Sequence, residues 1–342
     1  MDTSLPAEST FPKAEDIAQP LSARRIAPPL SWTKLLMLPA AAGIALGTHL
    51  LISQAESPVE TQTYTYLLSG LLAITILFAS LQKVWSGLRA WMDSSAPLFA
   101  AAFFFLILWE VATTGIRLLP LPYFPSPAKV LQSLIDDRVL IWDSTWHSLL
   151  LLVSGYLLGI TAGLISGVCI GWFGFARYWG MPILKVVGPI PATAWIPLVL
   201  IVSPDAFISA SSLIALAVWF PVTMLTASGI SNTRASYLDV ARTLGAKPSF
   251  LIFRVAIPAA MPNIFIGLFM GLGAAFLTLV VAENVGVKSG LGWYLSWSKE
   301  WAEYGKVYAV LAIMSLFFSS LMTLLFKVRD RILVWQKGTI KW

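Results

Sequence analysis

The sequence has few charged residues, a single cysteine and only two histidines. Charged residues make up 12% of its 342 residues. That is about half the share of a soluble globular domain, so the chain lacks the polar surface that a soluble protein needs. The single cysteine, Cys169, excludes a disulfide framework and a cysteine-ligated metal site. His49 and His147 lie far apart and have no nearby cluster of acids, so we expect no metal site.

Motifs for phosphate binding and hydrolysis are also missing. The sequence has no G-x-x-x-x-G-K-[ST], so the chain is not expected to bind ATP itself. It has no G-x-S-x-G elbow and no H-E-x-x-H pair, which argues against an intramembrane hydrolase. We therefore expect no enzyme activity, no catalytic residue and no bound cofactor. The net charge of +6 comes from basic residues in helix-flanking loops, which indicates membrane orientation and not nucleic-acid binding.

Hydrophobic residues make up 57% of the chain, and they gather in long runs. A spanning helix needs about 20 apolar residues, and about eight runs approach that length. They are residues 35–52, 67–81, 97–119, 147–172, 181–202, 209–229, 264–282 and 307–326. The sequence therefore predicts an all-α integral membrane protein with about eight transmembrane helices. Residues 1–31 are rich in Pro, Ser and Thr and are predicted to form a disordered cytoplasmic tail.

The remaining stretches lie between or beside these runs. Residues 123–145 and 287–306 are amphipathic and are expected at the membrane interface. If the N-terminus is cytoplasmic, most Lys and Arg residues fall on the cytoplasmic side, as the positive-inside rule requires. Both termini and the polar segment 237–264 are then cytoplasmic.

Two of the runs carry unusual residues. The fourth has glycine at every fourth position from Gly155 to Gly171, which predicts close packing against a neighbour in this chain or in a second copy. The fifth is interrupted by prolines, and broken helices at membrane depth are tolerated where they are buried in protein or line a cavity. Our candidate residues for a translocation path are Pro189, Pro191, Thr193, Trp195, Pro197, Trp219 and Glu283. Aromatic packing is the commoner role for the two tryptophans, and hydrogen bonding to residues 286–292 is the commoner role for Glu283.

The polar segment 237–264 lies between two apolar runs. Its spacing predicts a short helix, a turn and a second helix stopped by proline. Gly245 is a good helix C-terminal stop. Asp239 favours the helix dipole, and Arg242 could pair with acids of a partner. Taken alone, this hairpin reads as an ordinary cytoplasmic loop.

The hairpin also resembles a known pattern. Asp239-Val240-Ala241, three residues, Gly245, nine residues and Val255-Ala256-Ile257-Pro258 resemble the EAA loop, E-A-A-x3-G-x9-I-x-L-P, of permease subunits of ABC importers. The four departures, at residues 239, 240, 255 and 257, keep acidic or apolar character. Segments FPSPAKVLQSL (124–134), GPIPATAWIPL (188–198) and LVVAENVGVKSGLGW (279–293) are similar to the nitrate, sulfonate, taurine and bicarbonate branch of that family.

The resemblance implies a six-helix type I permease core over residues 97–342, with a coupling loop at residues 232–260. Two additional transmembrane helices then lie within residues 32–92. The residues that match the coupling loop are Asp239, Val240, Ala241, Arg242, Gly245, Ala246, Ile257 and Pro258. The implied partners are ATP-binding subunits that use ATP and Mg²⁺, a second permease copy forming a homodimer, and an extracytoplasmic substrate-binding protein. The implied location is the bacterial inner membrane.

The resemblance also implies the cargo, a small oxyanion such as nitrate, bicarbonate or an organosulfonate. The same branch includes permeases for vitamin precursors, so a non-anionic solute is an alternative. An ion-coupled secondary transporter is a second alternative, but such proteins usually place ionisable residues in the middle of the membrane. Here only Glu110, Lys185 and Glu283 come near, each close to the end of a predicted helix.

Overall fold

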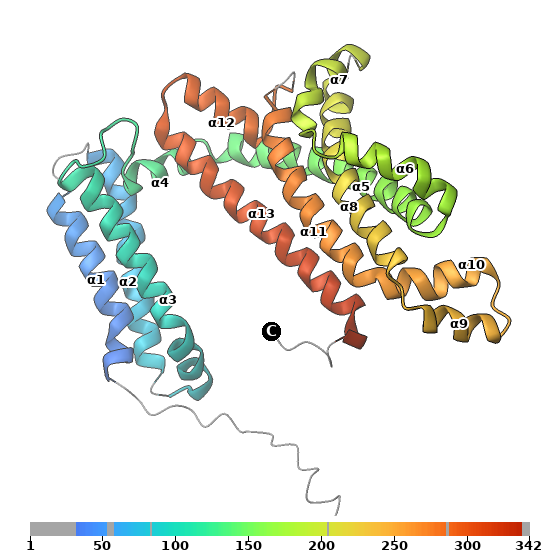
Figure 1. Ribbon diagram of the computed structural model, residues 1–342. Coiled ribbons are helices and arrows are strands. Elements are labelled where there is room, and N and C mark those ends of the chain that lie inside the picture. The colour runs from blue at the N-terminus through green and yellow to red at the C-terminus, as the bar shows by residue number, and fades with distance from the viewer. Residues whose placement is uncertain (1–31, 53–57, 83, 204, 285–286, 337–342) are drawn as a thin grey trace, which may run out of the picture. The chain divides into compact units, whose positions relative to one another are not determined.

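The computed structural model describes residues 32–52, 58–82, 84–203, 205–284 and 287–336, which are mainly helical (Figure 1). The tail expected at residues 1–31 lies outside the described residues. The elements are α1 (Trp32–Ile52), α2 (Pro58–Leu81), α3 (Ser86–Glu110), η2 (Val111–Gly115), α4 (Pro127–Asp136), α5 (Arg138–Trp172), α6 (Gly174–Val187), η3 (Ala192–Trp195), α7 (Ile196–Val202), α8 (Ala206–Ser231), α9 (Ala235–Thr243), α10 (Pro248–Phe250), η4 (Leu251–Ala256), α11 (Ile257–Ala282), α12 (Leu291–Glu300), α13 (Tyr304–Ile332) and η5 (Val334–Gln336).

Among the described residues, 7 helices are long and apolar enough to cross a membrane, or 8 if the bent pair α6 and α7 forms one span. This confirms the predicted all-α, multi-pass membrane fold. Several helices start earlier than the apolar runs that predicted them, among them α2 at Pro58, α3 at Ser86 and α5 at Arg138. Hydropathy marks only the part of a helix that lies in the bilayer, whereas backbone hydrogen bonding continues into polar residues of good helix propensity.

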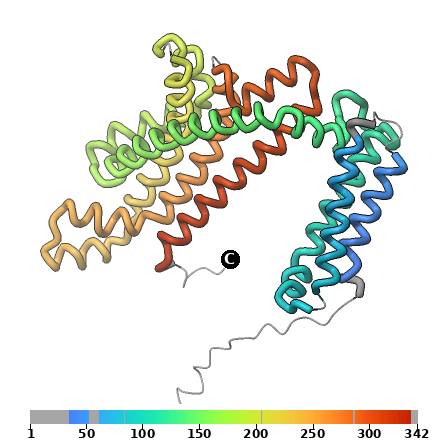
Figure 2. Tube along the Cα trace, turned by 180° about the vertical axis from the view of Figure 1, so that it is seen from behind, coloured from blue at the N-terminus to red at the C-terminus, as the bar shows by residue number. Residues whose placement is uncertain are grey.

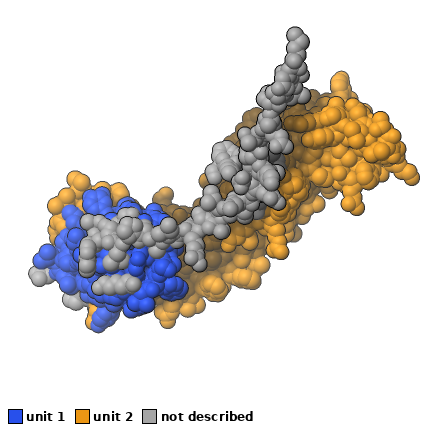
Figure 3. Space-filling view, turned by 90° about the horizontal axis from the view of Figure 1, so that it is seen from below, with its two compact units in different colours: residues 1–55, 65–111 blue, residues 56–64, 112–342 orange. Residues whose placement is uncertain are grey.

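The chain divides into two compact units (Figure 3). The first unit takes residues 1–55 and 65–111, and the second takes residues 56–64 and 112–342. Helix α3 packs along α1 and so belongs to the first unit. The permease core at residues 97–342 stays a prediction from the resemblance. An apolar run shows that a helix spans the membrane, but not which other helix it packs against.

A buried polar pair joins the helices of the first unit. His49 on α1 contacts the Glu110 carboxylate on α3 through Nδ1, and its Nε2 lies 3.0 Å from Oγ1 of Thr65 on α2. His49 is 0% exposed and Glu110 is 3% exposed. Ionisable side chains inside membrane helices are costly unless they are paired. The pair therefore explains how both side chains are accommodated, and it fixes the three helices in register.

The second unit is organised around the glycine stripe of α5. The five stripe glycines are Gly155, Gly159, Gly163, Gly167 and Gly171, and all are buried. A Cβ added at Gly159 would lie 2.6 Å from the Ala215 carbonyl oxygen and 2.6 Å from Val218 Cβ. Only glycine allows the two backbones to approach this closely. The neighbour of the stripe is therefore α8 of the same chain, which the sequence alone left open.

Helix α11 packs against the same helix, α8. Gly267 and Gly271 on α11 face Val222 and Val218 on α8. Figure 2 shows α5 running across α8 and α11 when the chain is seen from behind. Side chains such as Val218 and Leu279 are at most 1% exposed and belong to the largest apolar cluster of this unit. Helices α5, α8 and α11 thus form the packed centre of the second unit.

Short amphipathic helices α4 and α12 lie beside this centre, within the stretches predicted for the interface. Lys306 at the start of α13 reaches Asp137 at 3.0 Å and Glu303 at 2.8 Å. Tyr294 of α12 donates its hydroxyl to Asp137 Oδ2 at 2.6 Å. These bonds tie the beginnings of α5 and α13 to α12. The segment 287–306 is therefore a fixed part of the unit.

Candidate functional site

The polar hairpin forms a short helix, a tight turn and a returning helix at one end of the second unit (Figure 1). Helix α9 has no buried residue. The turn is closed by two backbone bonds, from Gly245 N–H to the Arg242 carbonyl at 2.9 Å and from Ala246 N–H to the Ala241 carbonyl at 3.0 Å. With Gly245 at φ +81°, this is a Schellman cap, which glycine forms without steric cost. The turn therefore has a defined shape before any partner binds.

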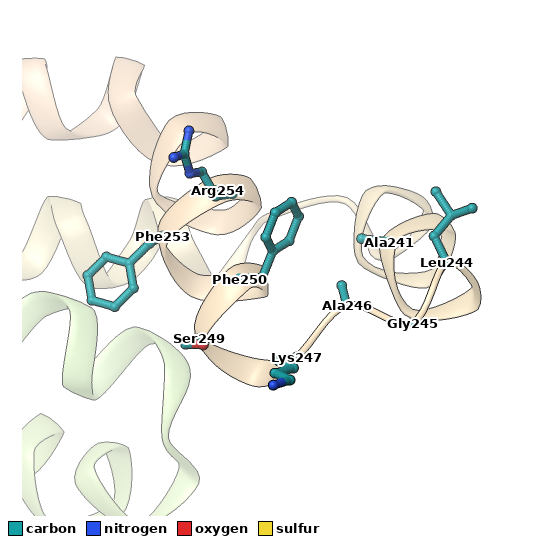
Figure 4. Close-up of a pocket in the computed structure, with 9 residues that line it drawn as sticks. All are labelled: Ala241, Leu244, Gly245, Ala246, Lys247, Ser249, Phe250, Phe253 and Arg254. Atoms are coloured by element: carbon teal, nitrogen blue, oxygen red, sulfur yellow. The ribbon is translucent and has the colours of Figure 1, made fainter.

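Exposed apolar side chains surround a groove at this turn (Figure 4). The groove has a volume of about 660 Å³, and its lining includes Ala241 of α9, Leu244 just after that helix, Phe250 of α10 and Phe253 of η4. Leu244 is 82% exposed, Phe250 51% and Phe253 66%. Exposed apolar side chains that cluster on a polar segment are typical of a surface that contacts a protein or a membrane. The sequence analysis did not select these three residues, although their apolar character within a polar hairpin is a visible signal.

The charged residues of α9 contribute less to this surface. Arg242 Nη1 lies 3.1 Å from Asp239 Oδ1, with the Arg and Asp side chains 57% and 63% exposed. Such a surface ion pair adds little stability. The structure thus pairs Arg242 with Asp239 of its own helix, a local partner that the sequence analysis did not assign. Val240 is 61% exposed on the same helix and extends the apolar surface.

The end of the hairpin differs from the sequence prediction of a helix stopped by proline. Pro258 stands in the first turn of α11, and the π-helical segment η4 leads into that helix without a break. Proline has no backbone N–H, but the N–H groups of a first helical turn have no partner within the helix, so proline is tolerated there. The π-helical turn of η4 changes the hydrogen-bond pattern just before Pro258. Ile257 packs beside Ala256 and Ile264 and anchors the hairpin to the core. Neither Ile257 nor Pro258 lines the groove.

A second candidate site is the cavity beside the bent pair α6 and α7. The two helices meet at an angle of 88° across a short break, where the prolines of the fifth apolar run predicted an interruption. The cavity has a volume of about 540 Å³, and its lining includes Pro191, Thr193, Trp195 and Trp219 of the predicted path residues. The other three path residues, Pro189, Pro197 and Glu283, are not part of the lining.

Helix α11 supplies the part of this cavity that the sequence analysis missed. Its lining residues are Met270, Ala274, Leu277, Thr278 and Val281. They share one helix face, at steps of three and four residues, but nothing in their apolar sequence distinguishes this face from the buried one. The cavity becomes visible only once α11 is packed against α8.

The lining of the cavity is apolar and aromatic, and none of its residues is charged. Its hydroxyl groups come from Thr193 and Thr278. The Trp219 indole donates to Ser166 Oγ at 3.0 Å. The buried Nε1 of Trp195 has no hydrogen-bond partner among the described residues. The cavity therefore offers few polar groups to a solute.

Glu283 has the alternative role that the sequence analysis gave it. It is 1% exposed, and its Oε2 accepts a hydrogen bond from Gly292 N–H at 2.6 Å. The carboxylate is thus bound to the glycine-rich segment at the start of α12. Within the described part of the chain, no group of three or more His, Cys, Asp or Glu residues could hold a metal ion.

Comparison with known proteins places this architecture in a family. The profile of the binding-protein-dependent transport system inner membrane component matches residues 155–333. A putative aliphatic sulfonates transport permease protein of Bacillus subtilis is 31% identical over 211 residues, which cover 61% of this chain and 76% of that protein. The taurine transport system permease protein of Escherichia coli is 28% identical over 217 residues, 61% of this chain and 78% of that protein.

A nitrate import permease protein of Synechococcus elongatus is 30% identical over 187 residues, 53% of this chain and 63% of that protein. The matched profile covers more than half of the chain, including α8, the hairpin, α11 and all of α13. The chain therefore belongs to the family of binding-protein-dependent transport system inner membrane components, and it is an ABC importer permease.

Proposed function

We propose that this chain forms the translocation path of an ATP-driven importer for a small anionic solute, and that the hairpin is the docking site of an ATP-binding subunit. The observation that carries this proposal is the exposed apolar groove at the turn between α9 and α10. The subunit would supply the ATP and Mg²⁺ chemistry for which this sequence has no phosphate-binding motif.

The shape of the hairpin favours docking. Its turn is held by the Schellman cap at Gly245, so little conformational freedom is lost when a partner binds. Leu244 at the tip is more exposed than Phe250 and Phe253, which line the groove behind it. A helix end that presents an apolar tip fits a cleft in a soluble partner.

The connection of the hairpin to the core favours coupling. Residues 248–282 form one helical stretch of 35 residues, which corresponds to about 52 Å at about 1.5 Å per residue. The stretch begins at the docking turn and carries Met270, Ala274 and Thr278 in the wall of the cavity. A displacement of the hairpin by the ATP-binding subunit would therefore move the wall of the path.

The named relatives support the class of solute. Aliphatic sulfonates, taurine and nitrate all carry an oxyanion group, and permeases named for them are similar to this chain. The lining of the cavity has no charged residue, which suits passage better than tight binding. An extracytoplasmic substrate-binding protein would then provide selectivity. The uncharged lining also admits a non-anionic solute such as a vitamin precursor, which is the second candidate.

The proposal includes an assembly and an orientation. A second copy of the chain would complete the path as a homodimer, and α7 offers exposed apolar residues such as Ile201 (81%) and Val202 (82%) for burial. In this orientation both termini lie in the cytoplasm and the membrane is a bacterial inner membrane; the excess of Lys and Arg near the hairpin and the C-terminus supports the cytoplasmic side for both.

Binding of the ATP-binding subunit by tagged variants of the chain tests the proposal. We expect Asp239→Lys and Gly245→Val to reduce its recovery strongly. The lysine replaces the acid that pairs with Arg242 in the middle of α9, and valine does not adopt the positive φ of Gly245 without strain. Asp143→Lys, at an exposed acid on α5, is the matched control and should bind normally. Undiminished binding by both hairpin variants would refute the docking role.

A further inference from the structure

Glu283 stands at the opposite end of α11 from the hairpin and holds three helices together. Its Oε1 accepts a hydrogen bond from Ser148 Oγ on α5 at 2.5 Å, and its Oε2 accepts one from Gly292 N–H on α12 at 2.6 Å. Glu283 is 1% exposed and Ser148 is 0% exposed. Short bonds to a buried carboxylate are the strong class of protein hydrogen bonds. Helices α5, α11 and α12 are thus joined at one point.

Ser148 completes the arrangement. While it donates to Glu283, its Oγ accepts a hydrogen bond from Leu291 N–H at 2.8 Å. Leu291 and Gly292 are the first two residues of α12, and the N–H groups of a first helical turn have no partner within the helix. The Ser148–Glu283 pair therefore caps α12, and without it two buried donors would lose their acceptors.

The chain around the carboxylate leaves no room for side chains. Gly290 has φ +119°, and a Cβ there would lie 2.4 Å from Oε1 of Glu283. A Cβ at Gly292 would lie 2.6 Å from the Val280 carbonyl oxygen. Two glycines that flank Leu291 thus allow the start of α12 to close on the end of α11. This close fit fixes the position of α12 relative to α11.

We define the latch as Glu283, Ser148 and the N–H groups of Leu291 and Gly292. The latch lies next to the cavity. Val281 and Thr278 of α11 line the cavity and stand within about one and a half helical turns of Glu283. The same helical stretch begins at the docking turn, at Pro248. One rigid element therefore connects the docking turn, the cavity wall and the latch.

We infer that the latch makes α12 move together with α5 and α11 when the hairpin is displaced, so that Glu283 is a positioning residue that couples ATP hydrolysis to opening of the path. This inference rests on the proposed function, because it takes the hairpin as the point where the ATP-binding subunit acts. Without the latch, α11 moves but α12 does not follow it. ATP hydrolysis then continues without opening the translocation path.

Two variants remove the latch in different ways. Glu283→Gln keeps the shape of the side chain but replaces one acceptor oxygen by an amide donor, so one of the two bonds is lost. Ser148→Ala removes the hydroxyl, adds no bulk and leaves Gly292 bonded to the carboxylate. Ser154→Ala on the same helix is the matched control, because the Ser154 hydroxyl donates to the Leu151 carbonyl of its own helix and joins no second helix in the described part of the chain.

The experiment uses the full complex in proteoliposomes, with the cognate ATP-binding subunit and substrate-binding protein. Uptake of labelled taurine, an alkanesulfonate and nitrate is measured with ATP hydrolysis in the same vesicles. We expect Glu283→Gln and Ser148→Ala to bind the ATP-binding subunit normally and hydrolyse ATP within about twofold of wild type, but to move at least about tenfold less solute per ATP. The double variant should move no less solute per ATP than the single variants, because the latch acts as one unit.

A purely structural role gives a different result, because unfolding lowers binding, hydrolysis and uptake together. That outcome, or an unchanged ratio of solute to ATP in both variants, overturns the inference. Should Glu283→Gln fail to reach the membrane, Ser148→Ala carries the same test. Failure of the proposed function is distinguishable, since the wild-type complex would then show no ATP-dependent uptake at all.

Discussion

The tip of the hairpin offers the sharpest test of docking. Leu244→Ala removes three carbon atoms from a side chain that is 82% exposed in this structure. If docking buries the leucine fully, the loss is about 0.8 kcal/mol per methylene, or about 2.4 kcal/mol in binding free energy. At about 1.4 kcal/mol per tenfold, this corresponds to about a 50-fold rise in Kd for the ATP-binding subunit. The stability of the permease itself should not change, because the side chain has few contacts to lose.

The assay is equilibrium binding of the purified ATP-binding subunit to permease in nanodiscs. Leu118→Ala is the matched control, because Leu118 is an equally apolar residue, 72% exposed, outside the hairpin. We expect the control to bind like the wild type. A Kd for Leu244→Ala within twofold of the wild type would show that the tip is not buried on docking, and it would refute the reasoning from exposure.

Three further predictions concern packing, pairing and the path. Gly159→Ala should lower the melting temperature of the purified permease, because its Cβ would lie 2.6 Å from α8 atoms and overpacking costs about 1–3 kcal/mol. The control Gly273→Ala has nothing within 4 Å of its Cβ and should keep the wild-type melting temperature. Equal losses in the two variants would contradict the close packing of the stripe glycines against α8. His49→Leu and Glu110→Leu should each destabilise the first unit by about 3–5 kcal/mol in thermal unfolding. The double variant should recover much of this stability, because it leaves no charge buried alone. Losses that add up in the double variant would contradict the pairing of His49 with Glu110. Ala274→Trp should fill the cavity of about 540 Å³ and abolish uptake with normal binding of the ATP-binding subunit, and normal uptake would remove this cavity from the path.

Local patterns were sufficient to predict the elements of the fold. Spanning helices follow from apolar runs because the bilayer core demands about 20 apolar residues per crossing. The break before η3 follows from Pro189 and Pro191, since proline removes backbone hydrogen bonds. The packing of α3 could not be predicted in this way. It depends on side chains such as His49 and Glu110, which contact each other although they are 61 residues apart in the sequence.

The candidate site shows the same division between local and long-range information. The shape of the hairpin turn is set by Gly245 and its neighbours, so the sequence predicted the end of α9. Glu283 was recognised as a residue that bonds the segment after it, but its second partner, Ser148, is 135 residues away. Ser148 is one of several serines in apolar helices, and nothing in the sequence distinguishes it from the others. Its role exists only after α5, α11 and α12 are packed together.

The most direct test of the central claim is uptake by proteoliposomes with and without the ATP-binding subunit. Vesicles that contain the permease, the ATP-binding subunit, the binding protein and ATP should accumulate at least one solute among taurine, an alkanesulfonate and nitrate. Vesicles that contain the permease alone should accumulate none of them, even with a proton or sodium gradient imposed. Gradient-driven uptake by the permease alone would contradict the account.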